Sequence, residues 1–214
     1  MTPAEASAEA RKIAALAPII PVLVVHDVAH ARPLAEALVA GGLPALEVTL
    51  RTPAALDVIA EMAKVDGGVV GAGTLLTPED VTRAKNAGAR FGVSPGATDL
   101  LLDACEAADL PTLPGASSAS EAMALLERGY DMLKFFPAEA AGGAPFLKSL
   151  ASPLPQIAFC PTGGVSPDNA ESYLKLPNVA CAGGSWVAPA AMMEAGDWGG
   201  IEQLARAASQ LTTG

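Results

Sequence analysis

The segment ALEVTLR (residues 45–51) places a carboxylate and a guanidinium on one side of an otherwise apolar run. Its apolar and polar residues alternate with the period of two of a β-strand, so Glu47, Thr49 and Arg51 share one face. A charge inside a protein is costly unless it is paired. Glu47 and Arg51 therefore either form a structural ion pair or belong to a site that uses both.

Lys134 is the one lysine of the six in the chain that interrupts an apolar run, MLKFFP (residues 132–137). Burial favours the uncharged amine, which is a nucleophile. The alternative is a lysine with a buried stem whose ammonium reaches solvent at a strand end. An inward carboxylate such as Glu47 favours chemistry, because an amine forms a Schiff base with a ketone while a carboxylate moves the protons. If the buried ammonium is unpaired, Lys134→Ala should still fold.

Two glycine pairs follow the last two apolar runs, in PTGGV (residues 161–165) and AGGSW (residues 182–186). Glycine lets a ligand approach the backbone closely, and the N–H groups of such loops bind phosphate. Two ordinary tight turns are the alternative. Their shared position after the last two runs favours a phosphorylated ligand.

The elements that must position these residues repeat along the whole chain. Eight apolar runs begin near residues 19, 45, 69, 90, 111, 131, 156 and 179. Helical patterns lie between them at 31–42, 53–64, 78–88, 98–108, 118–129 and 167–176, many opening on Pro, Asp or Ser and closing on Gly. Eight β-then-α units predict one α/β domain, a (β/α)8 TIM barrel over residues 1–214, with an extra N-terminal helix at about residues 4–16. A doubly wound sheet also alternates strands and helices, but neither GxGxxG nor GxxxxGK[ST] is present.

Composition excludes several classes of partner. The chain has 13 basic and 23 acidic residues, a net charge of −10, which predicts no binding to nucleic acid and no polybasic membrane anchor. The longest uncharged stretch, residues 13–25, is too short to span a bilayer and contains two prolines. The acidic start of the chain does not resemble a secretory signal. We therefore expect a cytoplasmic protein.

Metal chemistry is not expected from the candidate ligands. His26 and His30 in HDVAH have the i, i+4 spacing of a zinc-binding helix, but Asp27 is a natural helix cap between them and no third ligand stands out. The three cysteines, Cys105, Cys160 and Cys181, are widely spaced and predict buried thiols rather than disulfides.

Six segments, in the same order along the chain, resemble the 2-keto-3-deoxy-6-phosphogluconate (KDPG) aldolases. They are EVTLRT (47–52), GAGT (71–74), SPG (94–96), KFFPAE (134–139), FCPTGG (159–164) and GGSW (183–186), and the likeness runs from about residue 18 to 206. The resemblance implies a class I aldolase of the Entner–Doudoroff pathway that often also acts on 4-hydroxy-2-oxoglutarate. It further implies a homotrimer of (β/α)8 barrels with no metal and no organic cofactor, whose partner is a small phosphorylated keto acid.

Carried over by motif, the resemblance makes Lys134 the Schiff-base lysine and Glu47 the general acid and base. The substrate-binding residues that it implies are Arg51 and Thr74 at the pyruvate carboxylate and keto end, Pro95 beside them, Phe136 as an aromatic wall, and Thr162, Gly163, Gly164, Gly184 and Ser185 around the phosphate. Three alternatives stay open on sequence alone: an aldolase for the galactonate epimer, a metal-dependent lyase on the same barrel, and a non-catalytic barrel that binds phosphosugars.

Overall fold

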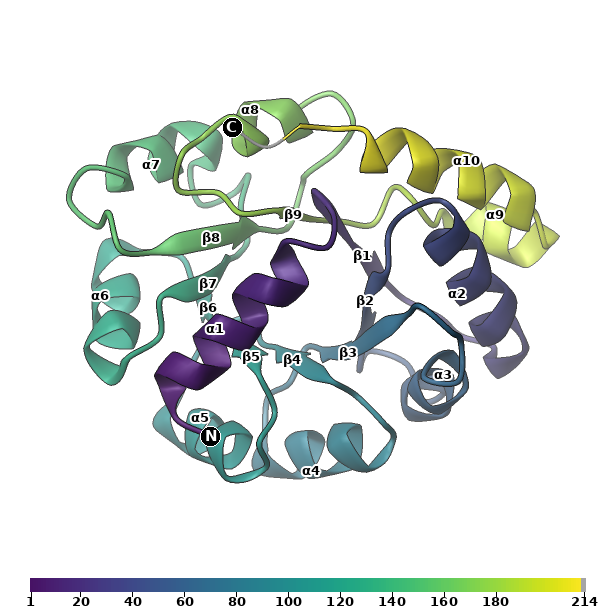
Figure 1. Ribbon diagram of the computed structural model, residues 1–214, viewed down its shortest axis with the longest axis horizontal. Helices are drawn as coiled ribbons and strands as arrows, with labels where there is room; N and C mark the ends of the chain where they lie inside the picture. Colours follow the sequence, from purple (N-terminus) through teal and green to yellow (C-terminus); the bar gives the residue numbers. More distant parts are fainter. Residues whose placement is uncertain (213–214) are drawn as a thin grey trace.

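The computed structural model describes residues 1–212 as a ring of parallel strands with helices around it (Figure 1). The strands are β1 (Ile19–Leu23), β2 (Ala45–Thr49), β3 (Val69–Gly73), β4 (Phe91–Val93), β5 (Thr112–Leu113), β6 (Gly115–Ala116), β7 (Met132–Phe135), β8 (Ala158–Pro161) and β9 (Ala182–Gly184). Each of the eight predicted runs contributes to the ring, which confirms the (β/α)8 barrel.

The ring closes through parallel pairing in chain order. Strands β5, β4, β3, β2, β1 and β9 form one sheet and β6, β7 and β8 another, and all their pairings are parallel. Isolated bridges between Phe159 and Val179 and between Thr162 and Gly183 join β8 to the β9 segment. The fifth run differs from the expected single strand. It is divided at Pro114, which has no N–H to donate, so that β5 pairs with β4 and β6 with β7.

The helices lie outside the ring, apart from the first. They are α1 (Pro3–Ala14), α2 (Ala31–Ala40), α3 (Ala55–Met62), α4 (Pro78–Asn86), α5 (Asp99–Ala107), α6 (Ala119–Arg128), α7 (Gly143–Leu150), α8 (Ala170–Leu174), α9 (Ala190–Ala195) and α10 (Trp198–Ser209), with a short 3-10 turn at Val28–His30. Every helical pattern predicted from sequence contains a helix, though α8 is five residues shorter than its pattern. The sequence patterns did not indicate α7, α9 or α10. Across residues 1–212, none of the helices has the length and apolar character needed to cross a membrane.

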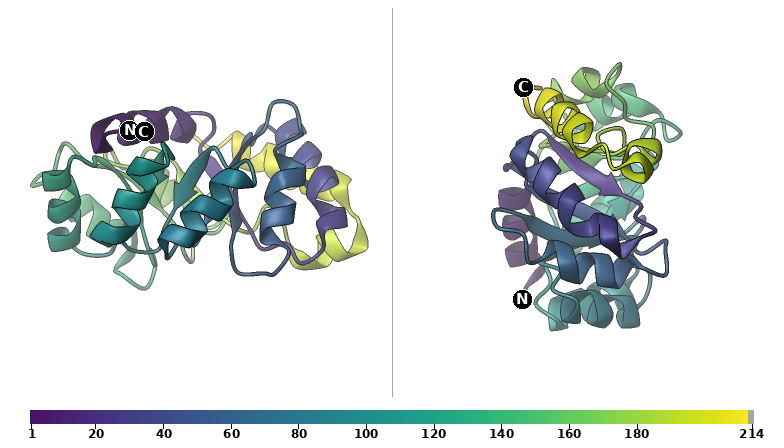
Figure 2. Two further views of the ribbon diagram at one scale, coloured as in Figure 1. Left: turned by 90° about the horizontal axis from the view of Figure 1, so that it is seen from below. Right: turned by 90° about the vertical axis from the view of Figure 1, so that its right-hand side faces the viewer.

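Helix α1 closes one end of the barrel. It runs across the ring in Figure 1 and lies on one side of the molecule in Figure 2. Its Ala10 and Ala14 pack against side chains that fill the barrel interior, among them Phe91, Met132 and Cys181. The predicted N-terminal helix is thereby confirmed. With this end filled, the other end, at the carboxyl ends of the strands, is the one where a cavity forms.

Candidate active site

A cavity of about 270 Å³ lies at the carboxyl ends of the barrel strands, where barrels of this kind place their sites. Ten of the eleven residues predicted for the site line it: Lys134, Glu47, Arg51, Thr74, Pro95, Phe136, Thr162, Gly163, Gly164 and Ser185. Four residues that the sequence did not single out as site residues also line it: Val22, Thr49, Val165 and Gly183. The barrel therefore gathers side chains from most of its strands in one place.

Lys134 and Glu47 meet across the barrel at the bottom of this cavity. The Lys134 Nζ atom lies 3.1 Å from Glu47 Oε1, and the two side chains are only 7% and 4% exposed. The ring centroid of Phe136 is 5.4 Å from the same nitrogen. A carboxylate in contact with a buried amine can take up its proton and return it, so a nucleophilic amine can form in place.

Arg51 does not form the ion pair with Glu47 that the strand pattern left open. Glu47 pairs with Lys134 instead, and within residues 1–212 no carboxylate forms a salt bridge with Arg51. Arg51 is exposed and lines the mouth of the cavity. A guanidinium there is available for the two-pronged hydrogen bonding that a ligand carboxylate offers.

The glycines of GAGT make room for the residues around them. A methyl group on Gly73 would overlap the carboxylate of Glu47, and one on Gly71 would overlap the ring of Phe91 inside the barrel. Gly73 lies opposite Thr49, two residues beyond Glu47 on the neighbouring strand. Gly71 therefore makes room for the barrel core, and Gly73 makes room for the site residue Glu47.

Thr74 follows β3 with a φ of +63°, in the left-handed region. That conformation is uncommon for a β-branched residue and costs free energy, and such residues cluster at functional sites. The turn directs the chain so that Thr74 lines the cavity.

The loop after β8 presents backbone N–H groups at the rim. Gly163 and Gly164 have φ angles of +100° and +80°, and both residues line the cavity with Val165. Among residues 1–212, no acceptor takes a hydrogen bond from the N–H of Gly164 or Val165. Successive N–H groups in such a turn form a concave anion site.

The second glycine pair is divided between two roles. Gly183 lines the cavity, and a methyl group on it would overlap the Thr162 hydroxyl. Gly184 is buried, and a methyl group there would overlap the ring of Trp186. The structure thus places Gly184 in the packing beneath the rim rather than on the cavity wall, while Ser185 beside it is exposed and lines the cavity.

Of the four additional residues, Thr49 carried a signal in the sequence. It shares the polar face of β2 with Glu47, and its hydroxyl donates to the Leu23 carbonyl oxygen at 2.9 Å. Val165 and Gly183 belong to the glycine segments. Val22 carried no signal, because a valine in a strand is indistinguishable from ordinary core.

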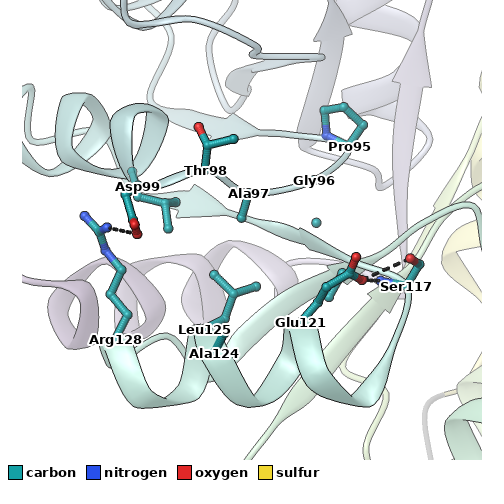
Figure 3. Close-up of a pocket in the computed structure, with 13 residues that line it drawn as sticks. Pro95, Gly96, Ala97, Thr98, Asp99, Ser117, Glu121, Ala124, Leu125 and Arg128 are labelled. Carbon is teal, nitrogen blue, oxygen red and sulfur yellow. Dashed lines mark hydrogen bonds and ion pairs between the residues drawn. The ribbon is translucent and has the colours of Figure 1, made fainter.

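A second cavity, of about 210 Å³, lies between α5 and α6 (Figure 3). Its charged side chains already have partners: Arg128 bonds to Asp99, and Glu121 accepts hydrogen bonds from Ser117. Pro95 lines both cavities. The cavity with Lys134 has the reactive groups and is the candidate active site.

The two histidines and three cysteines lie outside the cavity. The His30 ring meets the Trp198 ring edge to face, with centroids 5.5 Å apart. In the described part of the chain, no three His, Cys, Asp or Glu side chains are grouped to hold a metal ion. All three cysteines are buried free thiols. A hydrogen bond with Cys160, together with burial, holds the pKa of the Cys181 thiol well above its usual value, so that it stays protonated.

A parallel barrel with a buried lysine–glutamate pair in a cavity at the carboxyl ends of its strands has the arrangement of a barrel enzyme. The sequence model described as "KDPG and KHG aldolase" matches residues 10–204. The chain belongs to this family of lyases, which confirms the resemblance seen in the six motifs.

Two curated relatives match most of the chain. The 2-dehydro-3-deoxy-phosphogluconate aldolase of Pseudoalteromonas atlantica is 54% identical over 192 residues, 89% of each protein. The KHG/KDPG aldolase of Escherichia coli is 49% identical over 200 residues, 93% of this chain and 94% of the relative.

Solved structures of relatives share the fold closely. The KDPG aldolase of Zymomonas mobilis ZM4, solved with 3-phosphoglycerate, superposes with a TM-score of 0.93 at 48% identity and covers 97% of this chain and 98% of its own. The KDPG aldolase of Legionella pneumophila, solved with pyruvate captured as a covalent carbinolamine, has a TM-score of 0.90 at 46% identity and covers 94% and 98%.

Proposed function

We propose that this protein is a class I aldolase that cleaves 2-keto-3-deoxy-6-phosphogluconate to pyruvate and glyceraldehyde 3-phosphate through a Schiff base on Lys134. The observation that carries the proposal is the buried contact of Lys134 Nζ with Glu47 Oε1 at 3.1 Å. The covalent carbinolamine named for the Legionella relative is the chemistry that such an amine performs on pyruvate. The gluconate series is chosen because relatives sharing about half of the residues carry gluconate names.

The reaction begins when the neutral amine of Lys134 attacks the C2 ketone of the substrate. Loss of water from the carbinolamine gives an iminium, which accepts electrons from the neighbouring carbon. Glu47 takes the proton of the C4 hydroxyl, directly or through a water molecule, and the C3–C4 bond breaks. Glyceraldehyde 3-phosphate departs, and the bond's electrons form an enamine. Protonation at C3 and hydrolysis release pyruvate and restore Lys134.

The cavity walls hold the two ends of the substrate. Arg51 and Thr74 take the carboxylate and keto end, between the walls formed by Pro95 and Phe136. The far end carries the phosphate, which binds at the rim to Thr162, Gly163, Gly164 and Ser185. A protein with a net charge of −10 repels an anionic substrate at long range, so this local site supplies the attraction.

The proposed activity extends to 4-hydroxy-2-oxoglutarate. This substrate has the same pyruvoyl half as KDPG, so Lys134, Glu47 and Arg51 would act on it in the same way. The name of the Escherichia coli relative, KHG/KDPG aldolase, supports an activity on both substrates.

We further propose one barrel domain over residues 1–214 that assembles as a homotrimer. Four large apolar side chains within residues 1–212 are exposed. Leu16 follows α1, and the other three are Leu76 just before α4, Leu100 in the first turn of α5 and Met123 in α6. The last three side chains belong to α4, α5 and α6 or the turn before them, and exposed apolar side chains of this kind are what a second copy of the chain would cover. A cytoplasmic location is proposed with it, since the three cysteines are free thiols and the substrate is a phosphorylated metabolite.

Borohydride reduction in the presence of pyruvate tests the central proposal. We expect one pyruvyl adduct per chain on the peptide that contains Lys134, and none in Lys134→Ala. The yield should not change with a chelator, whereas a metal-dependent lyase would lose activity. An adduct on another residue, or no adduct, would overturn the mechanism. Absence of any adduct is the result expected of a non-catalytic barrel that binds phosphosugars.

A further inference from the structure

Glu139 and Tyr173 form a contact that the proposed chemistry does not use. Tyr173 on α8 is fully buried, and its hydroxyl donates a hydrogen bond to Glu139 Oε1, four residues beyond β7. Burial, reinforced by this bond to a carboxylate, raises the pKa of Tyr173, so the hydroxyl stays protonated as a donor. The bond ties the segment after β7 to the helix that follows the glycine loop.

Glu139 touches the glycine loop in two further ways. Its backbone N–H donates to the Gly163 carbonyl oxygen at 3.0 Å. A Cβ atom on Gly164 would lie 2.5 Å from Glu139 Cγ, so Gly164 packs directly on the stem of this side chain. One residue therefore fixes both members of the glycine pair.

Asn169 holds the same loop from its other side. Its Nδ2 donates to the Gly164 carbonyl oxygen at 3.0 Å, and its Oδ1 accepts from the Ser166 N–H at 2.8 Å. Both carbonyl groups of the glycine pair are thereby bonded to protein. The N–H groups of Gly164 and Val165 donate to no acceptor within residues 1–212 and are therefore available to a ligand.

We propose that Glu139, anchored by Tyr173, is a positioning residue that holds the Gly163–Gly164 turn in its anion-binding shape and so sets the affinity for the phosphate end of the substrate without contacting it. This inference rests on the proposed function, because it takes the loop as the phosphate subsite.

The physical reason is the freedom of the loop. Two adjacent glycines with positive φ have many other conformations open to them, and ordering them on ligand binding would cost entropy. A loop held in place before binding avoids that cost. Removal of the Glu139 side chain would free the turn and leave the Tyr173 hydroxyl without its acceptor.

The test compares four variants with the unchanged protein: Glu139→Ala, Glu139→Gln, Tyr173→Phe and Glu171→Ala. The Gln variant keeps an oxygen that accepts from Tyr173 and keeps the stem under Gly164. Glu171→Ala is the matched control, because it removes an exposed carboxylate two residues from Tyr173 whose partner is Lys175. The readouts are the affinity for inorganic phosphate by calorimetry, and kcat and KM for KDPG and for phosphate-free 2-keto-3-deoxygluconate.

We expect Glu139→Ala and Tyr173→Phe to weaken phosphate binding and to raise KM for KDPG by roughly tenfold, the value of one hydrogen bond to a charged group. KM for the phosphate-free acid should not change, and Glu139→Gln and Glu171→Ala should behave as the unchanged protein. An equal rise in KM for both substrates would mean that Glu139 only stabilises the fold. Unchanged phosphate affinity in both Glu139→Ala and Tyr173→Phe would mean that the loop keeps its shape without the bond between Glu139 and Tyr173. Either result overturns the inference.

The proposed function and this inference fail separately. Borohydride trapping with pyruvate measures Schiff-base formation on Lys134 and does not depend on the phosphate loop. Glu139→Ala should therefore give the full yield of adduct. Calorimetry with inorganic phosphate measures binding to the loop and needs no catalysis. Absence of the adduct would overturn the aldolase mechanism, and absence of phosphate binding by the unchanged protein would overturn the inference about the loop.

Discussion

Gly73 on β3 occupies the place beside Glu47 where any larger residue would overlap the carboxylate. The two strands pair in parallel with Thr49 opposite Gly73, so the carboxylate of Glu47 leans over the glycine. The absence of a side chain on one strand thus allows the acid–base group of the next to reach Lys134.

Gly73→Ala should therefore lower kcat while the barrel still folds. The added methyl group would move the Glu47 carboxylate from its 3.1 Å contact with Lys134, and misplacing a catalytic group by about 1 Å costs on the order of 10²-fold in rate. The control is Gly199→Ala in α10, where a methyl group would meet nothing within 4 Å. Steady-state kinetics and thermal unfolding of both variants give the answer. A normal kcat in Gly73→Ala would show that the carboxylate has room to adjust.

The pairing of Lys134 with Glu47 changes what removal of the lysine should do. A lone ammonium in an apolar strand predicted that Lys134→Ala would fold easily, but the structure shows an ion pair with both side chains buried. Loss of one partner leaves an uncompensated buried charge, which costs about 3–5 kcal/mol. We expect Lys134→Ala to lower the free energy of unfolding by about this amount, and Lys134→Met combined with Glu47→Gln to recover most of it.

Urea unfolding of the single and double variants measures this coupling, and kinetics separate it from catalysis. Glu47→Gln keeps the shape of the side chain, and its kcat should fall by roughly 10²–10⁴-fold, the range of a positioned acid or base. A near-normal kcat with a large loss of stability would assign Glu47 a purely structural role.

The barrel and most of the site residues could be predicted from the sequence, because both depend on local patterns. Alternation in residues 45–51 put Glu47 and Arg51 on the inner face, and the one lysine in an apolar run was Lys134. The ion pair between Glu47 and Lys134 could not be predicted from local patterns. The two residues are 87 positions apart in the sequence, and only closure of the ring brings β2 and β7 together.

The packing of residues beneath the cavity rim also could not be predicted from the sequence. Nothing in the letters GGSW distinguishes Gly183, which lines the cavity, from Gly184, which lies against Trp186. The segment from residue 182 to 200 contains α9 and the first residues of α10, and it is rich in glycine, a poor helix former, so its sequence did not indicate that helices begin there. Their position is set by tertiary packing, as the close contact of α10 with α2 shows.

Bulky replacement of Gly163 should affect the phosphorylated substrate selectively. A Cβ atom there would lie 3.3 Å from the Phe136 ring, and the φ of +100° is one that side chains rarely adopt. We expect Gly163→Val to reduce kcat/KM for KDPG far more than for 4-hydroxy-2-oxoglutarate, because binding energy at the phosphate also orients the substrate. Gly184→Ala is the comparison, since its overlap with Trp186 should lower stability without this selectivity. Equal losses on both substrates in Gly163→Val would place the phosphate elsewhere.

Glu121 should make the protein less stable in acid. Its Oε2 accepts hydrogen bonds from the N–H groups of Ser117 and Ser118 at 2.7 and 3.0 Å, at the start of α6. The bond from the Ser117 N–H is the main cause that lowers the pKa of Glu121 below its ordinary 4.5. A pKa that is lower in the folded state means that the unfolded chain binds the proton more tightly. The stabilisation is therefore complete above pH 4.5 and is lost as the pH falls through the folded value.

Urea unfolding of the unchanged protein and of Glu121→Gln across that range tests the sign. The unchanged protein should be the more stable of the two at neutral pH, and the difference should shrink as the pH falls below 4.5, where the protonated carboxyl and the amide become equivalent. Glu127→Gln near the other end of α6 removes the same charge without a capping bond and serves as the control. A difference that stays constant with pH, or grows in acid, would contradict the assignment of Glu121 as an ionised cap, because only loss of its charge weakens the bonds from Ser117 and Ser118.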